Sequence, residues 1–244
     1  FQRALAYQGL KKFIESEKDY EYALKLDPTN MKIPYNFGTM KFLQADYEGA
    51  LKMFDMTLKI DDSFVNAYND KGSCYRMLGK YPQAVAEYEK ALKRNPKLVY
   101  VLNNMGSAKA KNKDYQGATN AYNRAISLDK SFYLSYNNRG VILAEQDKVD
   151  DAIRDFEKVL EINPDYAPAA SNLSGVYFRK GEYEKALKYA EMAVKADPTN
   201  ASAYVNRGMA REMTRDQIGA CEDWNKANEL GDPKGKTYYS GNCF

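Results

Sequence analysis

A row of amide side chains recurs along the chain at a spacing of 34 residues, and its chemistry is the clearest that the sequence offers. Counted from Met31 as position 1 of a 34-residue unit, position 6 is occupied by Gln2, Asn36, Asp70, Asn104, Asn138, Asn172 and Asn206. A primary amide both donates and accepts, so such a row can pair with the N–H and C=O groups of an extended peptide whatever its side chains are. Asparagine within a helix is less favourable than alanine by roughly 0.6 kcal/mol, which indicates a role other than helix formation.

Polar side chains at position 5 lie next to this row. They belong to Tyr35, Asn69, Asn103, Asn137 and Ser171. Tyr100, at position 2, is an aromatic residue of the kind that anchors interfaces, or else it packs between adjacent units. The predicted peptide-binding residues are Tyr35, Asn36, Asn69, Asp70, Tyr100, Asn103, Asn104, Asn137, Asn138, Asn172 and Asn206. The alternative is that some of these amides only bond neighbouring helices.

The composition gives little support for catalysis. The chain has no histidine, which removes the commonest general base and zinc ligand. It shows no Gly-rich phosphate loop and no metal-ligand spacing. The carboxylates of Asp150, Asp151 and Asp155 alternate with basic residues and are interpreted as a solvated helix face. We therefore expect no enzyme activity, no cofactor and no metal.

The charge balance and hydropathy bear on the partners. With 36 basic and 33 acidic residues the net charge is +3, too balanced to favour nucleic acid. No apolar run approaches the roughly 18 to 20 residues of a membrane-spanning helix, so no membrane insertion is expected. A protein or peptide is the expected partner.

The 34-residue period continues from one end of the chain to the other without insertion or deletion. It predicts a single array over residues 1–230, followed by a short C-terminal capping segment at 231–244. The array consists of an incomplete leading unit, 1–30, and of 31–64, 65–98, 99–132, 133–166, 167–200 and 201–230.

Small and large residues alternate at fixed positions of the unit. Position 8 is glycine, alanine or serine, position 20 is alanine or serine, and position 27 is small in most units. Position 24 carries a ring in six units, with Ala190 as the exception. Proline at position 32 ends the unit at Pro28, Pro96, Pro164 and Pro198. The pattern predicts two closely crossing antiparallel helices per unit, at about positions 2–14 and 18–30.

The period of 34, the small residues at 8, 20 and 27, the ring near 24 and the proline at 32 resemble the tetratricopeptide repeat family. The resemblance covers nearly the whole chain. It implies an all-α fold, a right-handed superhelical α-solenoid of antiparallel helix pairs in which each unit packs on the next.

The resemblance also implies where the amides point. In this family positions 2, 5, 6, 9, 12 and 13 of the first helix face a concave groove, and the amide row is similar to the asparagine ladder of O-GlcNAc transferase. A non-catalytic scaffold that binds an extended peptide is therefore expected. Some members hold a chaperone's terminal carboxylate with a set of lysines, an arginine and asparagines. Here position 5 never carries lysine and position 6 never carries arginine, so binding of a chaperone tail is disfavoured.

The ends of the chain carry further expectations. Gly231 suits the left-handed backbone conformation that ends many α-helices, and Asp232-Pro233 suits the start of a short capping helix. Cys221 and Cys243 would pair if the tail folds back on the last helix, and would otherwise be two thiols. We expect native residues before Phe1. The last unit resembles closing units of bacterial members, many of them exported, which favours a bacterial protein of the periplasm or cell envelope.

Two alternative functions remain open. The chain could be the targeting or substrate-recruiting module of a larger enzyme, or a structural assembly subunit that associates with itself through its exposed ends. Recognition of RNA, one base per helical unit, is disfavoured by the near-neutral charge and the strict spacing.

Overall fold

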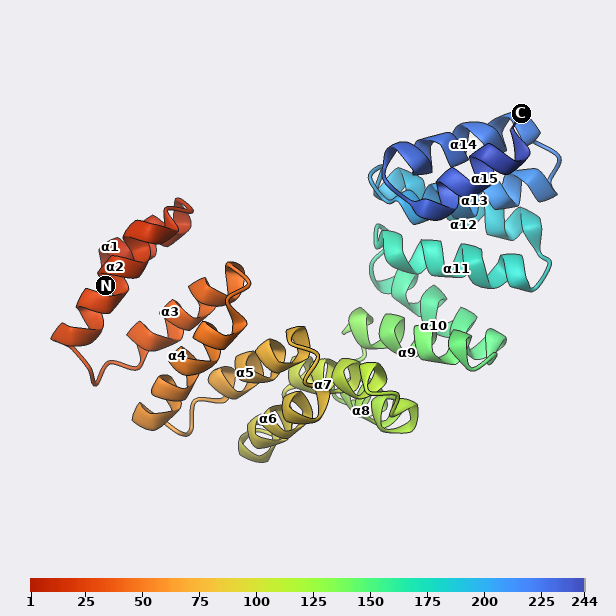
Figure 1. The fold of residues 1–244 in the computed structure, drawn as a ribbon. Helices are drawn as coiled ribbons and strands as arrows, with labels where there is room; N and C mark the ends of the chain where they lie inside the picture. The colour runs from red at the N-terminus through yellow and green to blue at the C-terminus, as the bar shows by residue number, and fades with distance from the viewer. Residues whose placement is uncertain (244) are drawn as a thin grey trace. The chain divides into compact units, whose positions relative to one another are not determined.

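The computed structural model describes residues 1–243, which are arranged in two compact units that divide between Asp129 and Lys130. Figure 1 shows both. Unit 1 contains α1 (Gln2–Gly9), α2 (Phe13–Leu26), α3 (Lys32–Leu43), α4 (Tyr47–Ile60), α5 (Val65–Met77), α6 (Tyr81–Arg94), α7 (Val99–Lys111) and α8 (Tyr115–Leu128). Unit 2 contains α9 (Tyr133–Glu145), α10 (Val149–Ile162), α11 (Ala167–Arg179), α12 (Tyr183–Ala196), α13 (Ala201–Met213), α14 (Gln217–Glu229) and α15 (Pro233–Asn242). Within the described residues every regular element is a helix, so the predicted all-α repeat fold is confirmed.

Each repeat is one pair of helices, the odd-numbered first helix and the even-numbered second helix that follows it. The two cross where the position-24 ring of the second helix lies on the position-8 residue of the first. A Cβ atom added to Gly106 would lie 2.5 Å from the ring of Tyr122, and one added to Gly140 would lie 2.8 Å from Phe156. The sixth repeat has no ring at position 24, and its Ser174 and Ala190 are both fully buried.

The turn between paired helices has the same conformation in all seven repeats. Position 15 takes a positive φ at Lys11, Ala45, Gly79, Lys113, Asp147, Gly181 and Arg215. This region of φ is costly for residues with a Cβ atom, and five of the seven repeats nevertheless use one. The next residue then caps the second helix where it is aspartate. Asp46, for example, accepts a hydrogen bond of 2.8 Å from the N–H of Gly49.

Ion pairs join the two helices of alternate repeats. Positions 7 and 23 carry the pairs Arg3–Asp19, Lys71–Glu87, Arg139–Asp155 and Arg207–Asp223. The intervening repeats carry Phe37 with Met53, Met105 with Ala121, and Leu173 with Tyr189. The interpretation of Asp155 as part of a solvated face was wrong. Its residue is only 5% exposed, because position 23 faces the first helix and the carboxylate accepts two hydrogen bonds from Arg139.

The last helix, α15, packs on α14 at the end of unit 2. Gly231 has a φ of 87°, and Asp232 accepts hydrogen bonds from the N–H groups of Lys234 and Gly235. The ring of Tyr238 stacks on Trp224 with 5.4 Å between centroids. A disulfide joins Cys221 to Cys243, so the tail does fold back on the last repeat. Cys74 is a buried free thiol whose pKa burial raises to about 12.

Candidate functional site

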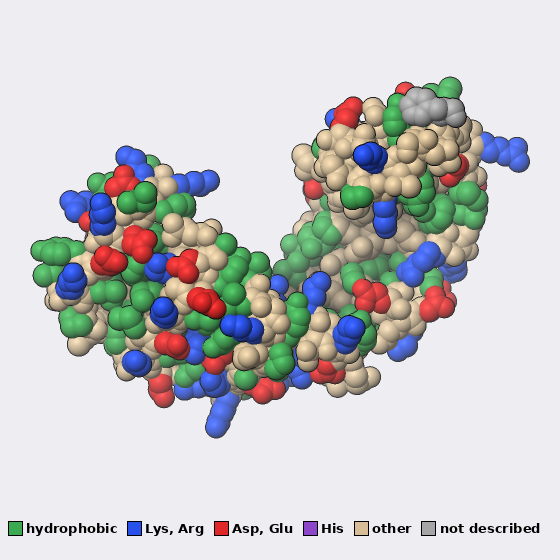
Figure 2. All heavy atoms as spheres, viewed as in Figure 1, with side chains coloured by type: hydrophobic (Ala, Val, Ile, Leu, Met, Phe, Trp, Pro, Cys, Tyr) green, Lys and Arg blue, Asp and Glu red, His purple; other side chains and the backbone are tan. Residues whose placement is uncertain are grey.

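The amide row lies on the first helices, at one position per repeat. In unit 1 it follows α3, α5 and α7, and in unit 2 it follows α9, α11 and α13. On the face that Figure 2 shows, acidic and basic side chains are interspersed over unit 1. The part of the unit 1 surface seen there is therefore of mixed charge.

Within each unit, a position-6 amide donates to position 5 of the preceding repeat. Asn104 donates to the Oδ1 atom of Asn69 at 3.0 Å, and Asn172 donates to Asn137 at 3.3 Å. Asn206 donates to both the carbonyl oxygen and the hydroxyl of Ser171, at 3.0 and 3.2 Å. Some amides of the row therefore bond the neighbouring repeat, as the alternative interpretation of these residues expects.

These bonds leave capacity for a ligand. Each side-chain amide has two N–H donors and a carbonyl oxygen. Among the described residues, the Oδ1 atoms of Asn104, Asn172 and Asn206 accept no hydrogen bond, and all three side chains are partly exposed. Three acceptors thus remain available on the first helices.

A four-residue network ties three repeats of unit 1 together. Tyr35 donates its hydroxyl to Oδ2 of Asp70 at 2.9 Å, and Asn69 donates to Oδ1 of the same carboxylate at 3.0 Å. Asn69 in turn accepts from Asn104. Burial raises the pKa of the Asp70 carboxyl above its usual range, although both hydrogen bonds oppose this shift. Burial and the charge of Asp70 likewise raise the pKa of Tyr35.

Replacing Asp70 with asparagine is expected to stabilise the protein at pH 7, because the ionised carboxyl is unfavourable in this buried position. The folded state holds its proton more tightly than the unfolded state, so the free energy of unfolding falls as the pH rises through the folded-state pKa. An asparagine amide can donate to Tyr35 and accept from Asn69. Its advantage should vanish near pH 3, below the ordinary pKa of about 3.9. Urea unfolding between pH 3 and 8 tests this, and an equal gain at every pH would contradict it.

The other predicted residues have different surroundings. Asn36 donates to the Lys32 carbonyl of its own helix at 2.7 Å, and Tyr100 donates to Oδ1 of Asn66 at 2.8 Å. Asn103 and Asn137 are each only 7% exposed. Asn138 accepts from Asn137 at 3.4 Å. The structure thus joins Tyr35, Asn69, Asp70 and Asn104 in one network, and Asn137, Asn138 and Asn172 in another.

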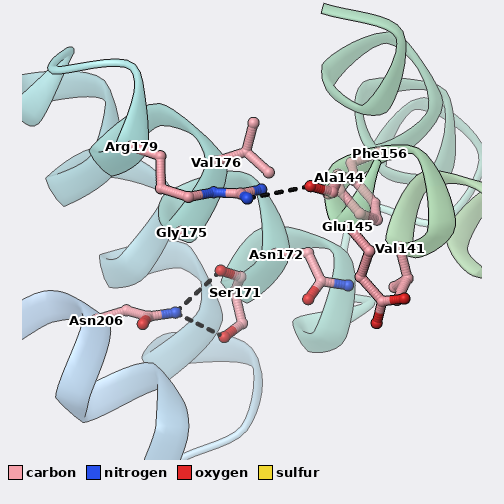
Figure 3. A pocket seen from close by; sticks show the side chains of 10 residues that line it. All are labelled: Val141, Ala144, Glu145, Phe156, Ser171, Asn172, Gly175, Val176, Arg179 and Asn206. Carbon is pink, nitrogen blue, oxygen red and sulfur yellow. Dashed lines mark hydrogen bonds between the residues drawn. The ribbon is translucent and has the colours of Figure 1, made fainter. Parts of the chain in front are cut away.

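A hollow of about 350 Å³ opens beside Asn172 and Asn206 in unit 2. Figure 3 shows Gly175 between Arg179 and Asn206, with Arg179 donating to the Ala144 carbonyl oxygen at 3.0 Å. Its lining consists of Val141, Ala144, Glu145, Phe156, Ser171, Asn172, Gly175, Val176, Arg179 and Asn206. The lining combines apolar side chains with two amides and with the charged groups of Glu145 and Arg179.

Gly175 is the residue of this site that sequence reasoning missed. It occupies position 9, where the other repeats have Leu5, Thr39, Ser73, Ser107, Val141 and Met209. The sequence signal for this hollow is that one repeat lacks a side chain at position 9. The shared pattern of the repeats does not contain it, because it is a difference between them.

Within residues 1–243, no group of three or more His, Cys, Asp or Glu side chains is arranged to hold a metal ion. No helix in that range has the length and apolar character needed to cross a bilayer.

The chain matches models of the tetratricopeptide repeat over residues 1–30, 65–98, 103–167 and 143–211. No curated protein matches it. The crystal structure of MamA is similar at 27% identity and a TM-score of 0.59, covering 70% of this chain and 94% of MamA. YrrB, described as a TPR protein with an unusual peptide-binding site, is 26% identical, with a TM-score of 0.57 and coverage of 75% and 95%.

A further structure shares the fold over the full length. A tetratricopeptide repeat protein from Parabacteroides merdae is 18% identical, with a TM-score of 0.77 and coverage of 100% of this chain and 97% of that one. With the repeat models and the paired-helix architecture, these similarities establish the family. The chain belongs to the tetratricopeptide repeat family.

Proposed function

We propose that this protein is a non-catalytic interaction scaffold whose first helices hold an extended segment of a partner protein. The observation that carries the proposal is the pair of unused amide oxygens on Asn172 and Asn206 of unit 2. These two residues occupy the same position in consecutive repeats. An extended peptide presents N–H donors at regular intervals, and such oxygens can accept from them whatever the peptide's side chains are.

The bonds between repeats favour this function. A position-6 amide that donates to the preceding repeat is fixed in orientation before a ligand arrives, as with Asn206 on Ser171. Fixing a side chain in advance lowers the entropic cost of binding. The peptide-binding site for which the similar protein YrrB is described supports the same class of function for this chain.

The proposal can be tested with peptides selected from a random dodecapeptide phage library against the folded protein. Asn172→Ala and Asn206→Ala should each weaken the selected peptides by about 3- to 10-fold, the range expected for one hydrogen bond. Asn120→Ala is the matched control, because Asn120 lies on the second helix α8 and accepts only from Gln116. If the double variant Asn172→Ala/Asn206→Ala binds the selected peptides as tightly as the wild type does, with an unchanged circular dichroism spectrum, binding through these amides is rejected.

A further inference from the structure

We propose that the hollow at Gly175 is a subsite for one aliphatic side chain, of about the size of leucine, in an uncharged and extended segment of the partner. The inference rests on the proposed function and adds the chemistry of the ligand. It is carried by the absence of a side chain at Gly175, the apolar side chains in the lining of the hollow and the mixed charge around it.

Gly175 lies in the middle of α11, where no feature of the fold requires glycine. A Cβ atom added there would meet one atom within 4 Å, Nδ2 of Asn206 at 4.0 Å, which is ordinary contact. The contrast with Gly140 is direct, because a Cβ atom there would collide with Phe156. Glycine in a helix interior also weakens the helix relative to alanine. The absence of a side chain at position 175 leaves open space beside α11.

Four of the ten residues that line this space have apolar side chains. Val141 and Ala144 come from α9, Val176 from α11 and Phe156 from α10. Phe156 and Val176 are at most 2% exposed, so the packing of unit 2 holds them in place. A volume of about 350 Å³ has room for a branched aliphatic side chain with its neighbouring backbone. Burial of such a side chain against fixed apolar walls is favourable.

The polar groups at the edge suit the backbone of the same ligand. Asn172 and Asn206 both line the hollow and keep free side-chain oxygens. Asn206 also lines a second hollow of about 320 Å³, bounded by Val205 and by Pro233 of α15. A segment seated at Gly175 can therefore continue past Asn206 toward the last helix.

The charges around the two hollows have no single sign, since Glu145 and Arg179 line the first and Asp232 and Lys234 line the second. Among positions 2, 5, 6, 9, 12 and 13 of α9, α11 and α13, the charged residues are Glu145, Arg179 and Glu212. Their signs are mixed, and Arg179 already donates to the Ala144 carbonyl oxygen. Neither an acidic nor a basic ligand finds a matching field here, whereas an uncharged segment loses little on entering.

The probe is N-acetyl-leucinamide, which carries one leucine side chain between two peptide groups and has no charge. Titration of the ¹⁵N-labelled full chain should shift the backbone signal of Gly175 and the side-chain amides of Asn172 and Asn206. Binding should be at least about 10-fold tighter than that of N-acetyl-glycinamide, as expected for burial of one leucine side chain. The acetyl amides of aspartate and lysine should bind no better than the glycine compound.

Gly175→Val is the decisive variant, because its side chain takes up space beside Asn206 and its Cβ atom lies at ordinary contact distance from that residue. It should abolish the leucine-dependent shifts while keeping or raising the thermal midpoint. Gly9→Val is the matched control, since Gly9 is also a helical glycine with no atom within 4 Å of an added Cβ. That variant should bind the leucine compound as the wild type does.

The possible outcomes distinguish failure of the subsite from failure of the proposed scaffold function. If library-selected peptides bind through Asn172 and Asn206 but N-acetyl-leucinamide does not shift Gly175, the subsite is rejected and the scaffold stands. Tighter binding of the aspartate or lysine compound, or leucine shifts that persist in Gly175→Val, also rejects the subsite. If no peptide shifts any amide of the row, the subsite and the scaffold are both rejected.

Discussion

Asp155→Ala is expected to lower the free energy of unfolding by about 3 kcal/mol, because it removes the buried carboxylate that accepts two hydrogen bonds from the Arg139 guanidinium. The two groups share hydrogen bonds of 2.7 and 2.6 Å, and the side chain of Asp155 is only 7% exposed. The side chain of Arg139 is 22% exposed, so water reaches part of its charge. This places the expected loss toward the lower end of the range for buried pairs.

The neighbouring repeats supply the rescue variant. Repeats without this ion pair carry apolar side chains at both positions, for example Met105 with Ala121. The double variant Arg139→Met/Asp155→Ala should therefore recover to within about 1 kcal/mol of the wild type, since replacing both charges removes the burial penalty together with the attraction.

Urea unfolding measures both variants, followed by circular dichroism and by the fluorescence of Trp224, the single tryptophan. Glu161→Ala is the control, because Glu161 lies on the same helix and pairs with Lys158 at 2.7 Å with its own side chain 69% exposed. It should change stability by less than about 1 kcal/mol. A double variant as unstable as Asp155→Ala would show that the pair is not the cause.

The helix pairs were predictable because their determinants are local and repeated. The ring of Phe156 needs a neighbour without a side chain, and Gly140 stands 16 residues before it. One such pair is weak evidence, but a recurrence every 34 residues fixes both the helices and their crossing. The alternation of ion pairs was equally visible, with a period of 68 residues from Arg3 to Lys71 to Arg139. This alternation is not seen within a single repeat, because it extends over two of them.

The directions of the amides were not predictable in the same way. Whether Asn104 reaches Asn69 depends on the displacement of α7 along α5, and a displacement is a property of packing rather than of spacing in sequence. The disulfide of Cys221 with Cys243 similarly required α15 to lie against α14. The hollow at Gly175 is a difference between repeats, and its shape depends on the positions of Val141 and Phe156.

Phe156→Ala is the second substitution with a large expected effect, a loss of about 3–5 kcal/mol in the free energy of unfolding. The ring is fully buried, and its removal leaves a cavity at the crossing of α9 and α10. Gly140→Ala alone should cost about 1–3 kcal/mol through overpacking, because the new Cβ would lie 2.8 Å from that ring.

The combination of these two substitutions tests whether the crossing itself sets the residue at position 8. Once the ring is absent, the alanine methyl at position 140 partly fills the cavity and improves the helix, so Gly140→Ala should become stabilising by about 0.5–1 kcal/mol. The sixth repeat already pairs a residue with a side chain, Ser174, with the small Ala190. Urea unfolding of the four proteins in this cycle gives the coupling energy. If Gly140→Ala has the same effect with and without Phe156, the ring does not determine the glycine.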